Sequence, residues 1–150
     1  MLSFPIMALR ADDPYNLQRF VDAQESIIAG VITELKQGRK RGHWIWFIFP
    51  QLKGLGHSAN SEFFGIASMQ EAAAYLEHPI LGSRLIECTR LVNAVEGRSA
   101  EAIFGEIDAM KFRSSMTLFA QATQDNQIFV AALSKYFAGE FDPLTIARLP

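Results

Sequence analysis

The sequence contains a single cysteine, Cys88, among 150 residues. One cysteine excludes an intrachain disulfide and is typical of proteins from a reducing compartment. No window of about eighteen apolar residues occurs, so we expect no membrane-spanning helix. The N-terminus lacks a basic leader before its short apolar part, and we expect no signal peptide. These absences predict a cytoplasmic protein.

A strong excess of charge of one sign is also missing. The net charge is −2 and the pI is near 5.9, which argues against a nucleic-acid-binding protein. The basic run Lys36–Arg41 fits a solvated helix end, with a nucleic-acid patch as the alternative. His57 and His78 lack the spacing of a zinc motif. We expect no metal and no cofactor, and we expect a monomer.

Hydrophobic residues make up 49% of the chain and charged residues 20%, as in ordinary globular proteins. We expect one domain over 1–150, with a loose arm over 1–15 and a weakly patterned tail over 140–150. Apolar spacing of 3.6 and capping residues predict an all-α single-domain bundle of about six to seven short and medium helices. The main segments are 17–37, 68–77, 79–97, 106–123 and 126–139, with shorter turns at 61–66 and 99–105.

The segment His43–Phe49 is almost entirely apolar and aromatic. Periodicity does not decide between helix and strand for so short a run. Aromatic content favours a strand, but no second segment offers itself as a partner, and a lone strand is not stable. We therefore expect a short buried helix that ends at Pro50.

Three long strings in the chain are distinctive: GHWIWFIFPQLKGLGHSANSEFFGI, EAAAYLEHPILGSRL and IFGEIDAMKFRSSMTLF. Over about Leu17–Tyr136 the chain resembles the uncharacterised bacterial family catalogued as DUF 1810. The resemblance implies a compact, mainly helical fold and no established activity. Some members carry the label "calpastatin", which these residues do not support, because calpastatins are largely disordered and repetitive whereas this chain is apolar and free of repeats.

The densest mixture of aromatic and polar residues lies in Lys40–Ser61. His43 is a candidate acid/base, hydrogen-bond donor to an anion or metal ligand, and Trp44 and Trp46 could stack a flat ring or close a pocket. The alternative is a buried aromatic cluster whose N–H groups find internal partners. Farther along, Gln51 and the glycine loop before Ser58 and Ser61 could present donors to a ligand. The alternative there is a tight turn with a serine N-cap.

A second unusual group lies in the segment 106–123. Helical spacing brings Asp108, Lys111 and Ser115 to one side, with Ser114 close to Lys111. Adjacent serines in mid-helix are locally unfavourable, which points to another role. Lys111 could activate a serine or bind an anion as a point charge, with Asp108 as its ion-pair partner. The alternative is an ion pair plus small residues that allow close helix packing.

Two functions of different classes remain. In the first, the chain binds a small anionic or nucleotide-like ligand between the 43–61 segment and the Lys111–Ser115 helix, or binds this ligand and acts on it. The candidate catalytic residues are His43, Lys111 and Ser115, but the sequence does not establish an enzyme. Its predicted ligand-binding residues are His43, Trp44, Gln51, Ser58, Ser61, Asp108, Lys111, Ser114 and Ser115. In the second, the chain is a non-catalytic protein-interaction module anchored by Trp44 and Trp46.

Overall fold

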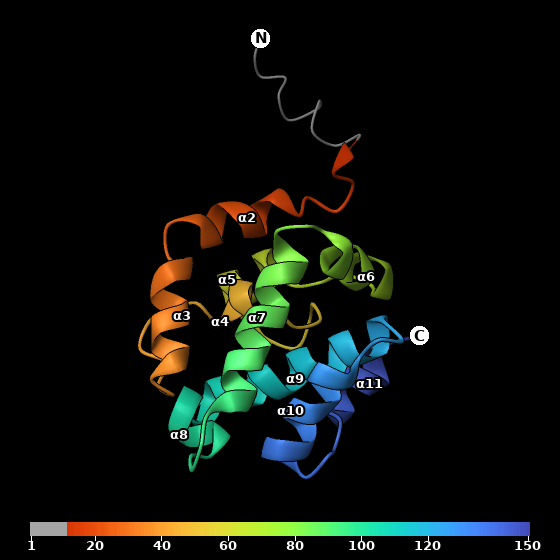
Figure 1. Ribbon diagram of the computed structural model, residues 1–150. Helices are drawn as coiled ribbons and strands as arrows, with labels where there is room; N and C mark the ends of the chain where they lie inside the picture. The colour runs from red at the N-terminus through yellow and green to blue at the C-terminus, as the bar shows by residue number, and fades with distance from the viewer. Residues whose placement is uncertain (1–11) are drawn as a thin grey trace.

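The computed structural model describes residues 12–150, which form a compact assembly of helices (Figure 1). No strand occurs in this range, and one isolated bridge pairs Leu52 with Ile66. The all-α prediction is confirmed, but the described residues form ten helices rather than six or seven. They are α2 (Gln18–Glu25), α3 (Ile28–Lys36), α4 (Ile45–Ile48), α5 (Ala59–Phe63), α6 (Met69–Glu77), α7 (Leu81–Ala94), α8 (Ala100–Phe104), α9 (Glu106–Ala122), α10 (Gln127–Phe137) and α11 (Pro143–Arg148).

The predicted loose arm over 1–15 lies mostly outside the described residues. Its last part is held in place, because the Asp13 carboxylate accepts the backbone N–H groups of Leu17 and Gln18 at 2.7 and 3.0 Å. These bonds satisfy donors that the start of α2 leaves without helical partners.

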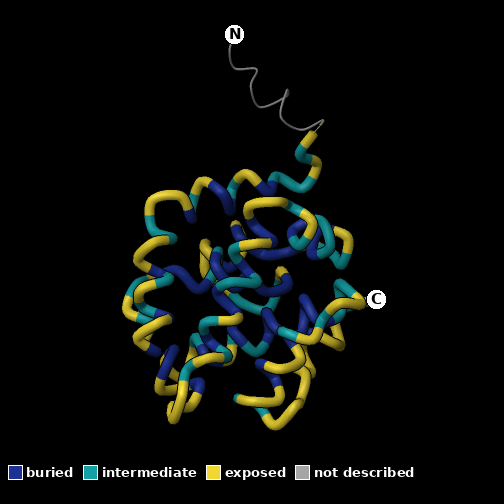
Figure 2. The backbone as a smooth tube through the Cα atoms, in the orientation of Figure 1, coloured by how far each residue is buried: buried dark blue, intermediate teal, exposed yellow. Residues whose placement is uncertain are grey.

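Helix α9 lies at the centre of the core and packs against α6, α8, α10 and α11. The Phe112 ring lies 4.9 Å from Phe49 and 4.7 Å from Phe104, measured between centroids, so α9 joins α4 and α8 through aromatic contacts. The backbone coloured by burial shows dark segments in the interior and exposed residues on the outer turns (Figure 2). Burial of such large rings supplies much of the stabilisation of a domain of this size.

The long helix predicted over 17–37 is wrong in one respect, because the chain divides it into α2 and α3. The break lies at Ser26 and Ile27, where Ile27 has a φ of −121°. Helix α2 packs against α4, whereas α3 packs against α7. A straight helix rises 1.5 Å per residue and could not follow both neighbours around the core. The turn therefore lets one apolar pattern cover two faces.

Local capping signals are confirmed where they are strongest. Ser68 accepts the N–H of Glu71 at 3.1 Å and begins α6, as its capping pattern predicts. The aromatic run forms helix, although only over Ile45–Ile48. The tail, expected to be weakly patterned, instead contains α11, which begins after the Asp142 cap with a proline in its first turn. A helix of six residues is too short to show a clear apolar period.

Candidate functional site

A pocket of about 220 Å³ opens between the loop after α4, the outer face of α9 and the start of α11. It therefore lies between the two segments that the sequence analysis singled out. Its lining combines five polar or charged side chains with four apolar ones and one glycine. The lining residues are Gln51, Leu55, Gly56, Ile107, Met110, Lys111, Arg113, Ser114, Asp142 and Leu144.

The loop beside the pocket brings three predicted residues close together, of which only Gln51 lines the pocket. A Cβ atom at Gly56 would lie 2.8 Å from the Cβ of Ser61 and 3.4 Å from the Gln51 amide nitrogen. Only glycine allows this approach. Ser58 donates its hydroxyl proton to Ser61 at 3.0 Å and accepts the Ser61 N–H at 3.1 Å. Ser58 is thus the N-cap of α5, which was the structural alternative for this serine.

The helical wall of the pocket is tied to the C-terminal helix. The Ser114 hydroxyl donates to the Asp142 carboxylate at 2.8 Å, and the same carboxylate caps α11 by accepting the N–H of Thr145. Arg113 donates to the backbone carbonyl oxygens of Glu140 and Phe141 at 3.2 and 2.9 Å. These bonds fix α11 beside α9, so three polar lining groups are engaged in holding the pocket walls together.

Lys111 is the cation of this pocket that remains available. Within residues 12–150 the structure gives it neither an ion-pair partner nor a side-chain hydrogen bond, although it is only partly exposed. Arg148 lies nearby, with its guanidinium directly over Gly54, where φ is +96° and any Cβ would collide with it. The glycine loop was predicted to approach a ligand or to form a tight turn, and at Gly54 it instead accommodates an arginine. Arg148, Arg113 and Asp142 carried no recognisable signal in the sequence.

The predicted ion pair between Asp108 and Lys111 is wrong. Asp108 instead lies 2.7 Å from the ammonium of Lys40. Lys40 also donates to the carbonyl oxygen of Gly42 at 2.5 Å and lies 5.1 Å from the centre of the Trp44 ring. Its side chain is only 7% exposed, so it is not part of a solvated helix end. Lys40 is thus a buried residue within the basic run 36–41, because the loop after α3 folds back onto the first turn of α9.

Trp44 belongs to this second cluster and not to the pocket. It is 3% exposed and donates its indole N–H to Glu34 at 2.9 Å. Burial acts to raise the pKa of Glu34, but the N–H groups of Arg41, Gly42 and Trp44 outweigh it, and the pKa lies below its ordinary value. The Trp46 indole nitrogen is buried without a partner among the described residues. The buried-cluster alternative therefore fits Trp44, whereas Trp46 is only partly buried and its N–H finds no such partner.

Two candidate catalytic residues do not reach the pocket. His43 is exposed and is absent from the pocket lining, so the expectation that it shares a cavity with Lys111 gains no support. Ser115 is fully buried, and its hydroxyl has no hydrogen-bond partner among the described residues. A nucleophile needs contact with substrate and a nearby base, which this position lacks. The sequence placed Ser115 on the correct helix, but it points into the core.

Among residues 12–150 no group of three or more His, Cys, Asp or Glu side chains is arranged to hold a metal ion. In the same range no helix combines the length and apolar character needed to cross a membrane. Among the residues that line the pocket, Lys111 is the cation without an ion-pair partner in the part of the chain that the structure describes.

The fold and the pocket define a compact all-helical protein with a small pocket lined by polar and apolar side chains. Residues 14–149 match the family described as "Protein of unknown function (DUF1810)", and the chain belongs to this family. The chain is similar to a solved structure, the conserved hypothetical protein Rv1873 from Mycobacterium tuberculosis. The two are 58% identical, the match covers 91% of this chain and 98% of that one, and the TM-score is 0.91. No curated protein matches the chain.

Proposed function

We propose that this protein binds a small anion with an apolar portion in the pocket formed by Gln51, Lys111 and their neighbours. The observation that carries the proposal is that Lys111 has no ion-pair or side-chain hydrogen-bond partner within residues 12–150. Of the other cations nearby, Lys40 and Arg113 form ion pairs with Asp108 and Glu140, and Arg148 lies over Gly54 outside the pocket lining. An ammonium group without a counter-ion beside a side-chain amide is suited to a carboxylate or phosphate oxygen.

The apolar part of the proposed ligand follows from the remaining lining. Ile107 and Met110 are 69% and 66% exposed, and Leu144 faces them from α11 at 65%. Exposure of three large apolar side chains around one pocket is costly in water and is typical of binding surfaces. A ligand that covers them gains hydrophobic contact while its charged end meets Lys111.

The volume of this pocket limits the size of the ligand that it can hold. About 220 Å³ is below the range of roughly 300–1,000 Å³ that holds drug-sized ligands. A whole nucleotide would extend beyond the pocket, whereas a short aliphatic or aromatic carboxylate, or a small phosphate ester, would not. The exposed position of His43 and the burial of Ser115 support binding rather than catalysis.

A titration of isotope-labelled protein followed by NMR tests the proposal. The probes are hexanoate, benzoate, inorganic phosphate and AMP. We expect the two carboxylates to shift the amide signals of 51–56 and of the first turns of α9 and α11. Lys111→Met should weaken hexanoate binding about tenfold or more, because a charge-assisted hydrogen bond contributes about 1.5–3 kcal/mol. Lys36→Met, on the exposed end of α3, is the matched control and should leave affinity unchanged.

Two results would contradict the proposal. One is the absence of shifts around the pocket with every probe. The other is an equal affinity of the Lys111→Met variant and the wild type for hexanoate.

A protein-interaction module is the second candidate, and the structure changes its basis. Trp44 is too buried to serve as an anchor, so the support for this function moves to Ile107, Met110 and Leu144. Pull-down with a triple serine variant of these residues as control would test it. A partner retained by the wild type and lost by the variant, without any small-molecule binding, would favour this candidate.

A further inference from the structure

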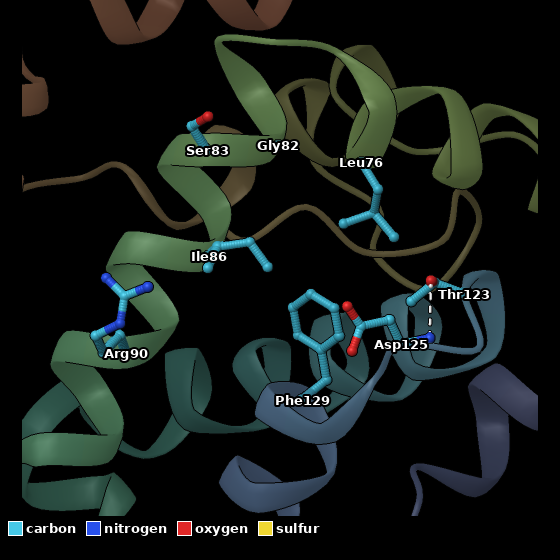
Figure 3. A pocket seen from close by; sticks show the side chains of 8 residues that line it. All are labelled: Leu76, Gly82, Ser83, Ile86, Arg90, Thr123, Asp125 and Phe129. Atoms are coloured by element: carbon cyan, nitrogen blue, oxygen red, sulfur yellow. Dashed lines mark hydrogen bonds between the residues drawn. The ribbon is translucent and has the colours of Figure 1, made fainter.

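A second hollow, on a different part of the molecule, shares no lining residue with the pocket of Lys111. It has a volume of about 480 Å³ and lies between α7 on one side and the α6 end and the α9–α10 loop on the other (Figure 3). Its base is apolar, with Ile86 from α7, Leu76 from α6 and the buried ring of Phe129 from α10.

The hollow exists because α6 and α7 meet very closely at one end. A Cβ atom at Gly82 would collide with the backbone carbonyl oxygen of Leu76, so only glycine fits there. Beyond this contact the two helices diverge, and the side chains of Leu76 and Ile86 face each other across the opening (Figure 3). The space is therefore fixed by backbone packing, not by the chance position of a surface side chain.

Two opposite charges flank the apolar base. Arg90 and Asp125 lie on either side of the Phe129 ring (Figure 3). The backbone N–H of Asp125 donates to the hydroxyl of Thr123 at 3.2 Å. No donor among residues 12–150 forms a hydrogen bond to the Asp125 carboxylate. Arg90 pairs with Glu87 through one terminal nitrogen, which leaves its other N–H groups available.

We propose that this hollow binds a zwitterion with an apolar body, such as an apolar amino acid or a short peptide. The ligand's ammonium group pairs with Asp125, its carboxylate with Arg90, and its apolar side chain covers Ile86 and Phe129. Charge complementarity fixes the direction of the ligand, and the apolar base supplies the contact area. The volume is within the range of ligand sites, unlike that of the Lys111 pocket.

The test uses the dipeptide leucyl-leucine with two derivatives, N-acetyl-leucyl-leucine and leucyl-leucine amide. Each derivative removes one charge and keeps the apolar body. NMR titration of the labelled protein gives the affinity and the position of each peptide. We expect shifts at Ser83, Ile86 and Asp125, and an affinity for either derivative about three- to tenfold weaker than for the dipeptide.

Variants then assign each charge to its partner. Asp125→Asn should weaken binding of the dipeptide about as much as N-acetylation of the dipeptide does. It should leave the affinity for the N-acetyl derivative unchanged. Arg90→Gln should behave in the same way toward the amide derivative. This non-additivity identifies a direct pair. Asp22→Asn, on the exposed side of α2, is the control and should change nothing.

The proposal is overturned if the three peptides bind equally, if none binds at millimolar concentration, or if the shifts fall elsewhere on the surface. It is also overturned if Asp125→Asn weakens binding of the N-acetyl derivative as much as binding of the free dipeptide. Because the two sites share no residue, each of these results leaves the anion site at Lys111 unaffected.

Discussion

The ammonium of Lys40 lies 2.7 Å from the carboxylate of Asp108 and joins the loop after α3 to the first turn of α9. The pair is largely enclosed, with side-chain exposures of 7% for Lys40 and 22% for Asp108. A carboxylate in the first helical turn is also favoured by the helix dipole. Lys40 and Asp108 therefore hold two distant segments in register beside Trp44.

Asp108→Asn should lower the free energy of unfolding by about 2–3 kcal/mol, because it leaves the Lys40 charge enclosed without a partner. Lys40→Met combined with Asp108→Leu should cost less than the sum of the two single substitutions, since the charges disappear together. Urea unfolding measures all of these variants. A change below about 0.5 kcal/mol in Asp108→Asn, the level of ordinary surface substitutions, would contradict the prediction.

Two neighbouring serines of α9 should respond in opposite directions. Ser115→Ala should raise the free energy of unfolding by about 1 kcal/mol, because the buried hydroxyl has no partner among the described residues. Ser114→Ala should lower it by about 1 kcal/mol, because its bond to Asp142 is lost. Thermal unfolding of both variants makes each the control for the other. A loss of stability in Ser115→Ala would show that its hydroxyl is satisfied in solution.

Trp44→Ala should lower the free energy of unfolding by about 3–5 kcal/mol, as other truncations of buried aromatic side chains do. Trp44→Phe keeps most of the ring but loses the N–H that Glu34 accepts, and we expect a loss of about 2 kcal/mol. Chemical denaturation of the two variants separates packing from the hydrogen bond. Unchanged stability in Trp44→Phe would mean that the bond to Glu34 contributes nothing measurable.

The contribution of Glu34 to stability should depend on pH. Its pKa in the folded protein lies below the ordinary value of 4.5, so the unfolded chain takes up the proton first as the pH falls. The stabilisation is therefore present above about pH 4.5 and is lost as the pH falls through the folded pKa. The stability difference between wild type and Glu34→Gln should shrink between pH 7 and pH 3. The exposed Glu77→Gln variant should differ little from wild type throughout, and a constant Glu34→Gln difference would refute the expectation.

Cys88 should be unreactive in the folded protein. Its side chain is buried, and burial raises the pKa of its thiol to about 12, so almost no thiolate forms near pH 8. We expect a thiol reagent such as DTNB to label it only as fast as the protein unfolds. Labelling in denaturant provides the control and should be complete at once. Rapid labelling under native conditions would show that α7 opens locally.

The sequence by itself determined the all-α fold, the position of most helices and one helical wall of the pocket, α9, whereas α11 was not predicted. These features depend on signals that act over a few residues. The Ser68 cap, the apolar stripe of α7 and Gly54 are examples, because caps, helical periodicity and positive φ depend only on the local chain. Gln51, Lys111 and Ser114, which the sequence analysis singled out, line the same pocket.

Only the tertiary structure decided which side chains pair. Asp108 could have paired with Lys111 on its own helix, but the fold places the Lys40 ammonium 2.7 Å away. The break between α2 and α3 depends on which neighbours each half packs against, and the exposure of His43 depends on where α4 begins. Helical spacing put Ser115 on the same side as Lys111, yet the burial of α9 on several sides encloses Ser115 and leaves Lys111 at the pocket. Such choices depend on packing between segments distant in sequence, which no local pattern records.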